Sequence, residues 1–467
     1  MLFNSLAFLV FAAGFFAAWP LVAGRRTPRL AAIAAASLVF YGFWDPRYVA
    51  LLVGTGVCDF CFGLAMARHP RVKNALLAAS ITVNLGALFA FKYSGFAART
   101  LDAALGALGK PTHLEAALPP LLKVLPPGIS FYTFQSMSYT IDVHQGRLKP
   151  TRSLLHFLAF IAMFPQLVAG PIVRARDLLP ALLEHRHPGR DARFAAVSLI
   201  VFGYFKKVVI ADHLAATVEA VYGAATPVSS FACWMATVMF AVQIYCDFSG
   251  YSDIARGLAR LMGYEFPVNF DHPYAARSMR ELWQRWHVSL SSWFRDYVYV
   301  PLGGRERPTR ALWITMLLSG LWHGASFTFV AWGAWHAALV TLERALGLPE
   351  RAERSAVGRA VRAPFVFLLV CVGWVFFRAG TLGRALAMLR AMFGSVPVID
   401  PSEIATLKAG WPLAFLALGA VTEWASNRAD AGRLRVPPAL RPLGVAVLAA
   451  LAVYLRGPGN AFIYFQF

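Results

Sequence analysis

Long blocks of apolar residues, separated by short polar connections, run along almost the whole chain. The first block, residues 1–24, contains no charged side chain, and blocks such as 48–67 and 229–248 are similar in length. A helix needs about 20 mostly apolar residues to cross the hydrocarbon core of a bilayer. The pattern therefore predicts an all-α polytopic membrane protein, because backbone in lipid must satisfy its own hydrogen bonds.

Thirteen blocks are candidate spans, and several of them are shorter than a full span. They are residues 1–24, 30–44, 48–67, 75–91, 127–141, 154–173, 194–211, 229–248, 310–321, 327–342, 364–377, 411–424 and 443–454. Short blocks interrupted by Gly or Pro are typical of re-entrant or broken helices that line a cavity. We expect about nine to thirteen true spans by length. Together they would form one transmembrane domain over residues 1–467, with the partly amphipathic segment 94–124 along the interface.

Basic residues cluster in two early connections: Arg25, Arg26 and Arg29 after the first block, and Arg68, Arg71 and Lys73 after the third. By the positive-inside rule both connections face the cytoplasm, so the N-terminus faces away from it. No small-residue cleavage site precedes Arg25, which favours a retained first span over a signal peptide. Two later connections, 147–152 and 174–193, are both basic, which predicts a re-entrant segment at 154–173.

Composition narrows the class of protein further. The chain is 58% hydrophobic and 15% charged, whereas soluble domains carry about 25% charged residues. Lys plus Arg is 44 and Asp plus Glu is 24, so the net charge is 44 − 24 = +20. The cations lie in short connections and not on one face of a soluble module, so we expect no nucleic-acid partner.

Polar residues are concentrated between Gln243 and His336, which we take as the catalytic core segment, 243–336. Ionisable groups within apolar stretches are costly and mark candidate functional sites. The candidates here are Asp247, Ser249, Tyr251, Asp253, Arg285, Trp286, His287, Arg295, Trp322 and His323. A transporter stays open as an alternative, since Asp59, Asp247 and Asp253 would lie near membrane depth.

Spacings of three and four place much of one polar set on one face of a predicted helix: Arg285, Ser289, Ser292, Arg295 and Asp296. The adjacent face carries Trp286, Leu290 and Trp293. Two interpretations remain: a helix that lines an entrance, or an interfacial helix with snorkelling arginines and belt tryptophans.

Three histidines are candidates for chemistry. His323 lies in an apolar run without a carboxylate within one helical turn, so it would be neutral and able to accept a hydroxyl proton. The alternative is a core histidine bonded to a backbone carbonyl. Gly320 and Gly324 are expected to leave room for substrate beside it. His336 lies about 20 Å and about 220° further along a continuous helix, so it meets His323 only if the chain turns between them. His287 would either approach His323 or face lipid head groups.

Motifs for other chemistries are missing from the sequence. It contains no G-x-x-x-x-G-K-[ST] loop, no G-x-S-x-G elbow and no H-E-x-x-H pair, which argues against a P-loop enzyme, a serine hydrolase and a zinc protease. We expect no metal site, because the histidines lack suitably spaced carboxylate or cysteine partners.

Several blocks closely resemble the membrane-bound O-acyltransferase family, in particular the bacterial branch that contains the alginate O-acetylation membrane protein. They are PGISFYTFQ at 127–135, FPQLVAGPIVR at 164–174, KKVVIADH at 206–213, DFSGYSD at 247–253, RWHVSLS at 285–291 with RDY at 295–297, WHG at 322–324 and GWVFFR at 373–378. Their order and spacing cover almost the whole chain.

The resemblance implies a multi-helix bundle whose cytoplasmic and external funnels meet at a buried histidine, and acyl transfer to a hydroxyl. His323 matches the catalytic histidine of the family and His287 its second functional histidine. Arg285 and Arg295 would hold the donor's phosphates, and Trp286 or Trp322 would shape the tunnel. Asp247, Ser249, Tyr251 and Asp253 would complete the substrate and donor site.

The resemblance also implies substrates and partners. The donor would be acetyl-coenzyme A, with no bound cofactor, and the acceptor an extracytoplasmic polysaccharide. A periplasmic SGNH or esterase-like acetyltransferase would complete the transfer outside a bacterial inner membrane. Alternatives are cell-wall or teichoic-acid acylation, including D-alanyl transfer, and a transporter or flippase without covalent chemistry.

Overall fold

The computed structural model describes residues 1–167, 170–184, 186–226, 229–348, 356–397, 410–459 and 462–463, and these residues form helices and no strand. The all-α prediction is confirmed. Within these ranges, six helical segments are long and apolar enough to cross a membrane: Leu6–Ala23, Arg47–Arg68, Pro70–Ala107, Arg190–Gly223, Ser230–Leu261 and Ala360–Arg378. Several other expected spans form helices of 16 or 17 residues. The expected nine to thirteen spans stay a prediction.

Contacts between helices group the chain into two compact units, residues 1–197 with 255–267, and residues 198–254 with 268–467. The first unit contains α1 (Leu6–Ala23), α2 (Arg26–Gly42), α3 (Arg47–Arg68), α4 (Lys73–Leu88), α5 (Ser94–Ala107), α6 (Leu114–Ala117), α7 (Ile129–His144), α8 (Leu154–Ile161), α9 (Phe164–Leu167), α10 (Ala175–Leu183) and most of α11 (Arg190–Tyr204). The expected single transmembrane domain stays a prediction.

The second unit contains the catalytic core segment almost entirely. Its elements are the π-helix η4 (Phe205–Ala211), α12 (Asp212–Gly223), most of α13 (Ser230–Leu261), α14 (Met279–Arg285), α15 (Val288–Phe294), the π-helix η6 (Arg295–Tyr299), α16 (Pro308–His323), α17 (Phe327–Leu346), α19 (Ala356–Arg378), α20 (Leu382–Met392), α22 (Gly410–Asp430) and α23 (Arg441–Tyr454).

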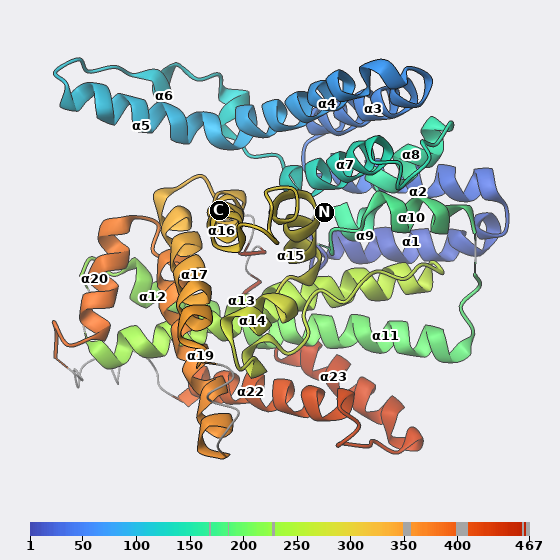
Figure 1. Cartoon of the computed structure of the whole chain (residues 1–467). Coiled ribbons are helices and arrows are strands. Elements are labelled where there is room, and N and C mark those ends of the chain that lie inside the picture. The colour runs from blue at the N-terminus through green and yellow to red at the C-terminus, as the bar shows by residue number, and fades with distance from the viewer. Residues whose placement is uncertain are drawn as a thin grey trace. The chain divides into compact units, whose positions relative to one another are not determined.

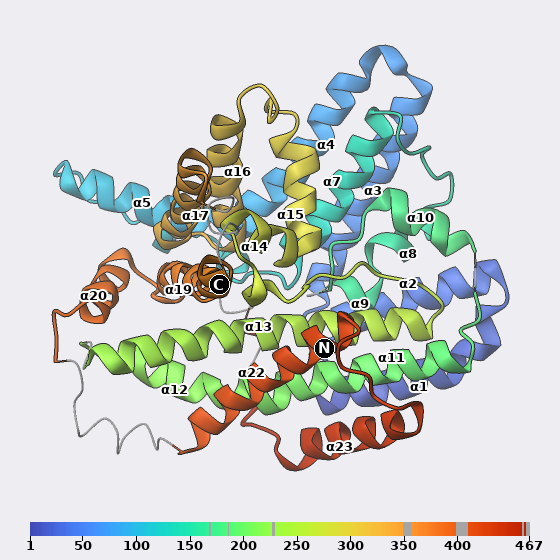
Figure 2. The same ribbon diagram turned by 60° about the horizontal axis from the view of Figure 1, so that its bottom comes forward.

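Helices α3, α4 and α7 pack side by side in the first unit (Figures 1 and 2). Helix α7 is buried along nearly its whole length although its sequence, ISFYTFQSMSYTIDVH, is rich in hydroxyl groups. These groups find partners inside the bundle: the buried carboxylate of Asp59 accepts hydrogen bonds from Ser80, Asn84 and Ser136. Polar side chains thus tie the three helices together.

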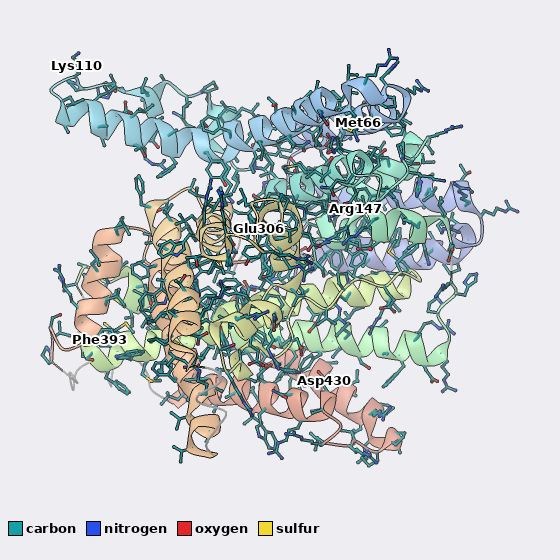
Figure 3. All side chains as sticks on the ribbon, in the orientation of Figure 1. Met66, Lys110, Arg147, Glu306, Phe393 and Asp430 are labelled. Carbon is teal, nitrogen blue, oxygen red and sulfur yellow. The ribbon has the colours of Figure 1, made fainter. Side chains whose placement is uncertain are left out.

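Two segments of this unit bear on the sequence predictions. Helices α5 and α6 form an extended arm with Lys110 at its tip (Figure 3), and Leu101 and Leu108 on it are exposed. The interfacial position of 94–124 stays a prediction. The segment 154–173 is broken into α8 and α9, and its residues 168–169 lie outside the described ones.

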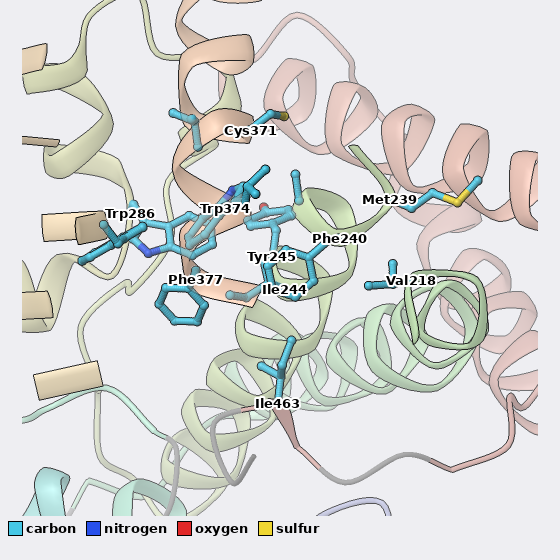
Figure 4. Packing of buried hydrophobic residues seen from close by; sticks show 14 of the residues in the cluster. Val218, Met239, Phe240, Ile244, Tyr245, Trp286, Cys371, Trp374, Phe377 and Ile463 are labelled. Atoms are coloured by element: carbon cyan, nitrogen blue, oxygen red, sulfur yellow. The ribbon is translucent and has the colours of Figure 1, made fainter. Parts of the chain in front are cut away.

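An aromatic core holds the second unit together. Trp286, Trp374 and Phe377 pack against residues of α13, and Ile463 from the end of the chain joins the same cluster (Figure 4). The rings of Trp286 and Trp374 lie 5.0 Å apart. The cluster joins residues of η4, α12, α13, α14, α16, α17, α19 and α20 in one core.

Candidate functional site

Helices α16 and α17 form a tight hairpin that presents His323 at its turn. A Cβ atom on Gly320 would lie 2.2 Å from the carbonyl oxygen of Phe329, and one on Gly333 would lie 2.4 Å from that of Met316. Only glycine allows this approach of the two backbones. Helix α16 ends at His323, and the Ser326 hydroxyl caps α17 by accepting from the Thr328 N–H.

His323 is buried, with 4% of its surface exposed, inside a cage of aromatic rings. The ring of Trp322 lies 5.1 Å away, that of Trp332 5.0 Å and that of Phe377 5.3 Å. The expectation that Gly320 and Gly324 leave room for substrate is wrong. A Cβ on Gly324 would lie only 2.0 Å from the Phe329 ring, so these glycines serve helix packing.

The predicted helix through Arg285 and Arg295 is broken at His287. Helix α14 ends at Arg285 and α15 begins at Val288, because His287 adopts a left-handed conformation with φ of 43°. Such a φ is strained for a residue other than glycine. The break turns the His287 side chain inward, where 1% of the residue is exposed, so it does not face lipid head groups.

Asn269 holds His287 in one orientation. Its Oδ1 accepts from the Ser289 N–H at 3.2 Å and the Ser289 hydroxyl at 2.8 Å, and His287 Nδ1 lies 3.1 Å from the same oxygen. Since that atom accepts from a backbone N–H it must be the oxygen, and His287 Nδ1 must therefore donate. The other nitrogen, Nε2, is then the proton acceptor of the neutral ring. Burial lowers the pKa of His287 to about 3, so the ring is neutral.

Trp322 lies between the two histidines. Its ring is 5.9 Å from that of His287 and 5.1 Å from that of His323. His336 reaches the same region from α17, because the chain turns at 324–326 as the sequence required: its ring and that of His323 both pack on Trp332, at 4.8 and 5.0 Å. Three histidines and two tryptophans thus form one buried group.

A cavity of about 430 Å³ opens beside this group. It is lined by Arg280, Trp283, Gln284, Val288, Ser291, Ser292, Phe294, Arg295, Tyr299, Leu312, Thr315, Met316, Ser319, Val340 and Arg344. Ser319 precedes His323 by one helical turn, which brings the inner end of the cavity toward that histidine. Three arginines and an apolar interior suit an elongated anionic ligand with an apolar end.

The sequence identified one of these arginines and missed two. Arg295 lines the cavity, with Asp296 beside its guanidinium at 2.7 Å. Arg285 instead pairs with Glu281 at 2.8 Å and donates to the Asp271 carbonyl. Trp286 packs into the aromatic core against Trp374. No pattern in the sequence around Arg280 or Arg344 indicates a binding site, because these residues meet Arg295 only when α14, η6 and α17 pack together.

The polar residues of α13 are engaged by two lysines of η4. Lys206 donates to Ser249 at 2.9 Å and to Asp253 at 2.5 Å. Lys207 lies 2.9 Å from Asp212 and 2.7 Å from Asp247. These contacts need the backbones to touch: a Cβ on Gly203 would lie 2.5 Å from the Gly250 carbonyl oxygen. A binding role for Asp247, Ser249 and Asp253 stays a prediction.

The end of the chain also reaches α13. The Ile463 N–H donates to Asp247 Oδ2 at 2.7 Å, and the Phe462 ring lies 4.3 Å from that of Tyr251. Phe462 also packs on Phe248, whose ring lies 4.7 Å from His287. Asp247 and Tyr251 therefore hold the C-terminal segment against the wall of the site, a role that the sequence did not reveal.

Among the residues that the structure describes, no group of three or more His, Cys, Asp or Glu side chains lies close enough to hold a metal ion. The site offers instead an aromatic cage, a neutral histidine and a basic cavity.

Residues 143–378, half of the chain, match the sequence profile of MBOAT, the membrane-bound O-acyltransferase family. The chain belongs to this family. The match spans both histidines, the α13 cluster and every residue that lines the cavity. Membership identifies the protein as a membrane O-acyltransferase, and the matched residues include the segment described above.

Several curated proteins are similar over most of their length. A probable alginate O-acetylase AlgI of Pseudomonas putida is 41% identical over 401 residues, covering 84% of this chain and 80% of the relative. A peptidoglycan O-acetyltransferase of Helicobacter pylori is 34% identical over 393 residues, covering 77% and 72%. A teichoic acid D-alanyltransferase of Streptococcus thermophilus is 31% identical over 228 residues, covering 45% and 54%.

Proposed function

We propose that the protein transfers acetyl groups from acetyl-coenzyme A toward hydroxyls of an extracytoplasmic polysaccharide, with His323 as the general base. The observation that carries the proposal is the placement of His323 and His287 on either side of Trp322, beside a basic cavity of about 430 Å³. O-acetylation of alginate and of peptidoglycan by the relatives supports an acetyl group and a sugar hydroxyl.

The reaction needs one proton shuttle. The acceptor oxygen attacks the thioester carbonyl while His323 takes the hydroxyl proton, and a new C–O bond forms. The C–S bond then breaks, and the proton on His323 passes to the departing thiolate. No oxidant or metal is required. The apolar cage strengthens the charge interactions of the transition state, because it excludes water.

The cavity suits the donor. Arg280, Arg295 and Arg344 would provide cations for the phosphates of coenzyme A. Leu312, Met316 and Val340 would line the path of its thioester arm. Asn269 fixes the His287 ring so that Nε2 can accept a hydrogen bond. This nitrogen would orient the hydroxyl of the substrate that receives the acetyl group. Acetyl-coenzyme A acts as a substrate, and no resident cofactor is needed.

The positions of donor and acceptor determine the membrane in which the protein would work. A cytoplasmic donor and an external polymer require a multi-pass protein in the bacterial inner membrane. A separate periplasmic esterase-like transferase would complete delivery to the polymer.

The test is His323→Ala. Loss of the general base should lower transfer of label from [14C]acetyl-coenzyme A by about 10²–10⁴-fold, with the amount and unfolding temperature of the protein retained. His69→Ala, at an exposed histidine, is the control. Polymer acetylation at the wild-type level in the His323 variant would refute the proposal.

D-alanyl transfer is the second candidate, on account of the teichoic acid relative. Membranes given either labelled acetyl-coenzyme A or a D-alanyl thioester separate the two. Label transferred only from the D-alanyl thioester would replace the first candidate with the second.

A further inference from the structure

His336 is a buried histidine to which the proposed reaction assigns no task. One per cent of its surface is exposed, and within the described residues neither Nδ1 nor Nε2 has a hydrogen-bond partner. Buried polar groups in proteins are almost always hydrogen-bonded, and each exception calls for an explanation such as a ligand.

Two indole N–H groups beside His336 share this property. Over the same part of the chain, Nε1 of Trp283 and Nε1 of Trp332 are buried without a partner. The His336 ring lies 5.0 Å from Trp283 and 4.8 Å from Trp332, and the two indoles are 5.5 Å apart. We call these three residues the His336 cluster.

The His336 cluster borders the cavity through Trp283, on whose ring His336 packs. Trp283 is part of its lining, and on α17 the residues one and two turns beyond His336, Val340 and Arg344, line it as well. On α16 the lining residues Leu312, Met316 and Ser319 lead along the same face to His323. Two facing rows of residues, one on α16 and one on α17, thus run from the arginines of the cavity to His323 and His336.

The hydrogen-bonding capacity of the cluster defines a ligand class. Each indole supplies a donor, and a neutral imidazole supplies one donor and one acceptor. A carbonyl oxygen would accept from the donors, and an amide N–H would donate to the imidazole nitrogen. The pantetheine arm of coenzyme A carries such amide groups between its phosphates and its sulfur.

We propose that the His336 cluster binds an amide of the donor's pantetheine arm and so sets the depth at which the thioester meets His323; this inference rests on the proposed function. The cluster is a specificity-determining subsite, separate from the arginines that would hold the phosphates.

Binding of two probes by the full-length protein in lipid nanodiscs tests the assignment. Coenzyme A carries phosphates and amides, whereas pantetheine carries the amides alone. His336→Phe should weaken both probes by the same factor, about three- to tenfold for a lost hydrogen bond. Arg344→Gln should weaken coenzyme A only. His69→Phe is the matched control and should change neither affinity.

Kinetics adds a second readout. With acetyl-coenzyme A as donor, His336→Phe should raise KM by the same factor as the loss of affinity and change kcat little. A change in the KM of the acceptor, or equal affinities of wild type and variant for pantetheine, would overturn the assignment. Absence of coenzyme A binding to the wild type would refute the proposed donor itself.

A second, more conservative variant tests the assignment if His336→Phe folds poorly. A Cβ on Gly373 would lie 3.0 Å from His336 Nε2, so Gly373→Ala crowds the nitrogen without removing it and should also weaken pantetheine. If the cluster only encloses a water, this variant lowers the unfolding temperature and leaves pantetheine affinity unchanged, which would also overturn the assignment.

Discussion

At the scale of single residues, orientation matters as much as identity. His287 could be recognised as a candidate from the sequence, but its tautomer depends on Asn269, 18 residues away in the chain. A backbone N–H from Ser289 fixes which atom of Asn269 faces the ring. Asn269 itself gave no signal in the sequence, because a lone asparagine in a loop is unremarkable without its contacts.

Asn269→Ala should impair catalysis more than stability. Loss of the acceptor lets the His287 ring turn, and misplacement of a reacting group by about 1 Å can cost of order 10²-fold in rate. We expect kcat for acetyl transfer to fall by roughly that factor, with the donor KM unchanged. Ser252→Ala is the control, since it removes only the partner of the Asn269 amide at 3.1 Å. Equal kcat values for Asn269→Ala and wild type would contradict this role.

At the scale of elements, close backbone contacts decide which polar residues meet. The contact of Gly203 with Gly250 places η4 on α13, so that Lys207 lies between Asp212 and Asp247. Asp247 in turn holds the Ile463 N–H. Asp247 and Asp253 could be identified from the sequence as unusual, but their partners could not, because Lys207 and Lys206 lie at least 40 residues earlier, on another helix.

Lys207→Met should destabilise the protein strongly. The substitution removes the cation that two buried carboxylates contact, and breaking a buried pair in this way costs about 3–5 kcal/mol. The unfolding temperature in detergent measures the loss, and the C-terminal segment should become sensitive to protease. Arg260→Met, at an exposed pair with Glu265, should cost no more than about 1 kcal/mol.

Neutralising the whole ion cluster separates charge from packing. Adding Asp212→Asn and Asp247→Asn to Lys207→Met should restore much of the stability, because no unpaired charge is left in the interior. An equally unstable triple variant would contradict this prediction and show that the lost hydrogen bonds, and not an unpaired charge, cause the instability.

At the scale of the whole molecule, contacts between distant segments hold the second unit around its site. His272 links the loop before α14 to α22: Nδ1 lies 2.9 Å from Glu423 and Nε2 lies 2.9 Å from Asp430, which Figure 3 labels at the end of that helix. Tyr245 of α13 donates to the same Glu423 at 2.6 Å. The loop that carries His272 also carries Asn269, so this link supports the site.

The His272 link predicts a pH-dependent stability. The hydrogen bond to Glu423, together with Asp430, raises the pKa of His272 from 6.5 to about 9 against the opposing effect of burial. Since the folded-state pKa is the higher one, the stabilisation is complete below about pH 6.5 and is lost as the pH rises through about 9. The difference in unfolding temperature between wild type and His272→Gln should therefore be largest at pH 6 and small at pH 10. A difference that stays constant over this range would contradict the prediction.

The sequence by itself determined the class of this protein, its all-α structure and its family, and it predicted the segment 243–336 as the catalytic core. Apolar blocks, and polar residues within them, are local properties of the sequence. They can be recognised from the hydration free energy of each side chain alone, without knowledge of its contacts. Only the tertiary structure decided that Asp247 holds the end of the chain, that Arg344 and not Arg285 lines the cavity, that Gly324 packs against Phe329, and that His336 meets His323 on one tryptophan. Those outcomes depend on which helices touch, and a buried polar group takes its role from the partner that packing brings to it.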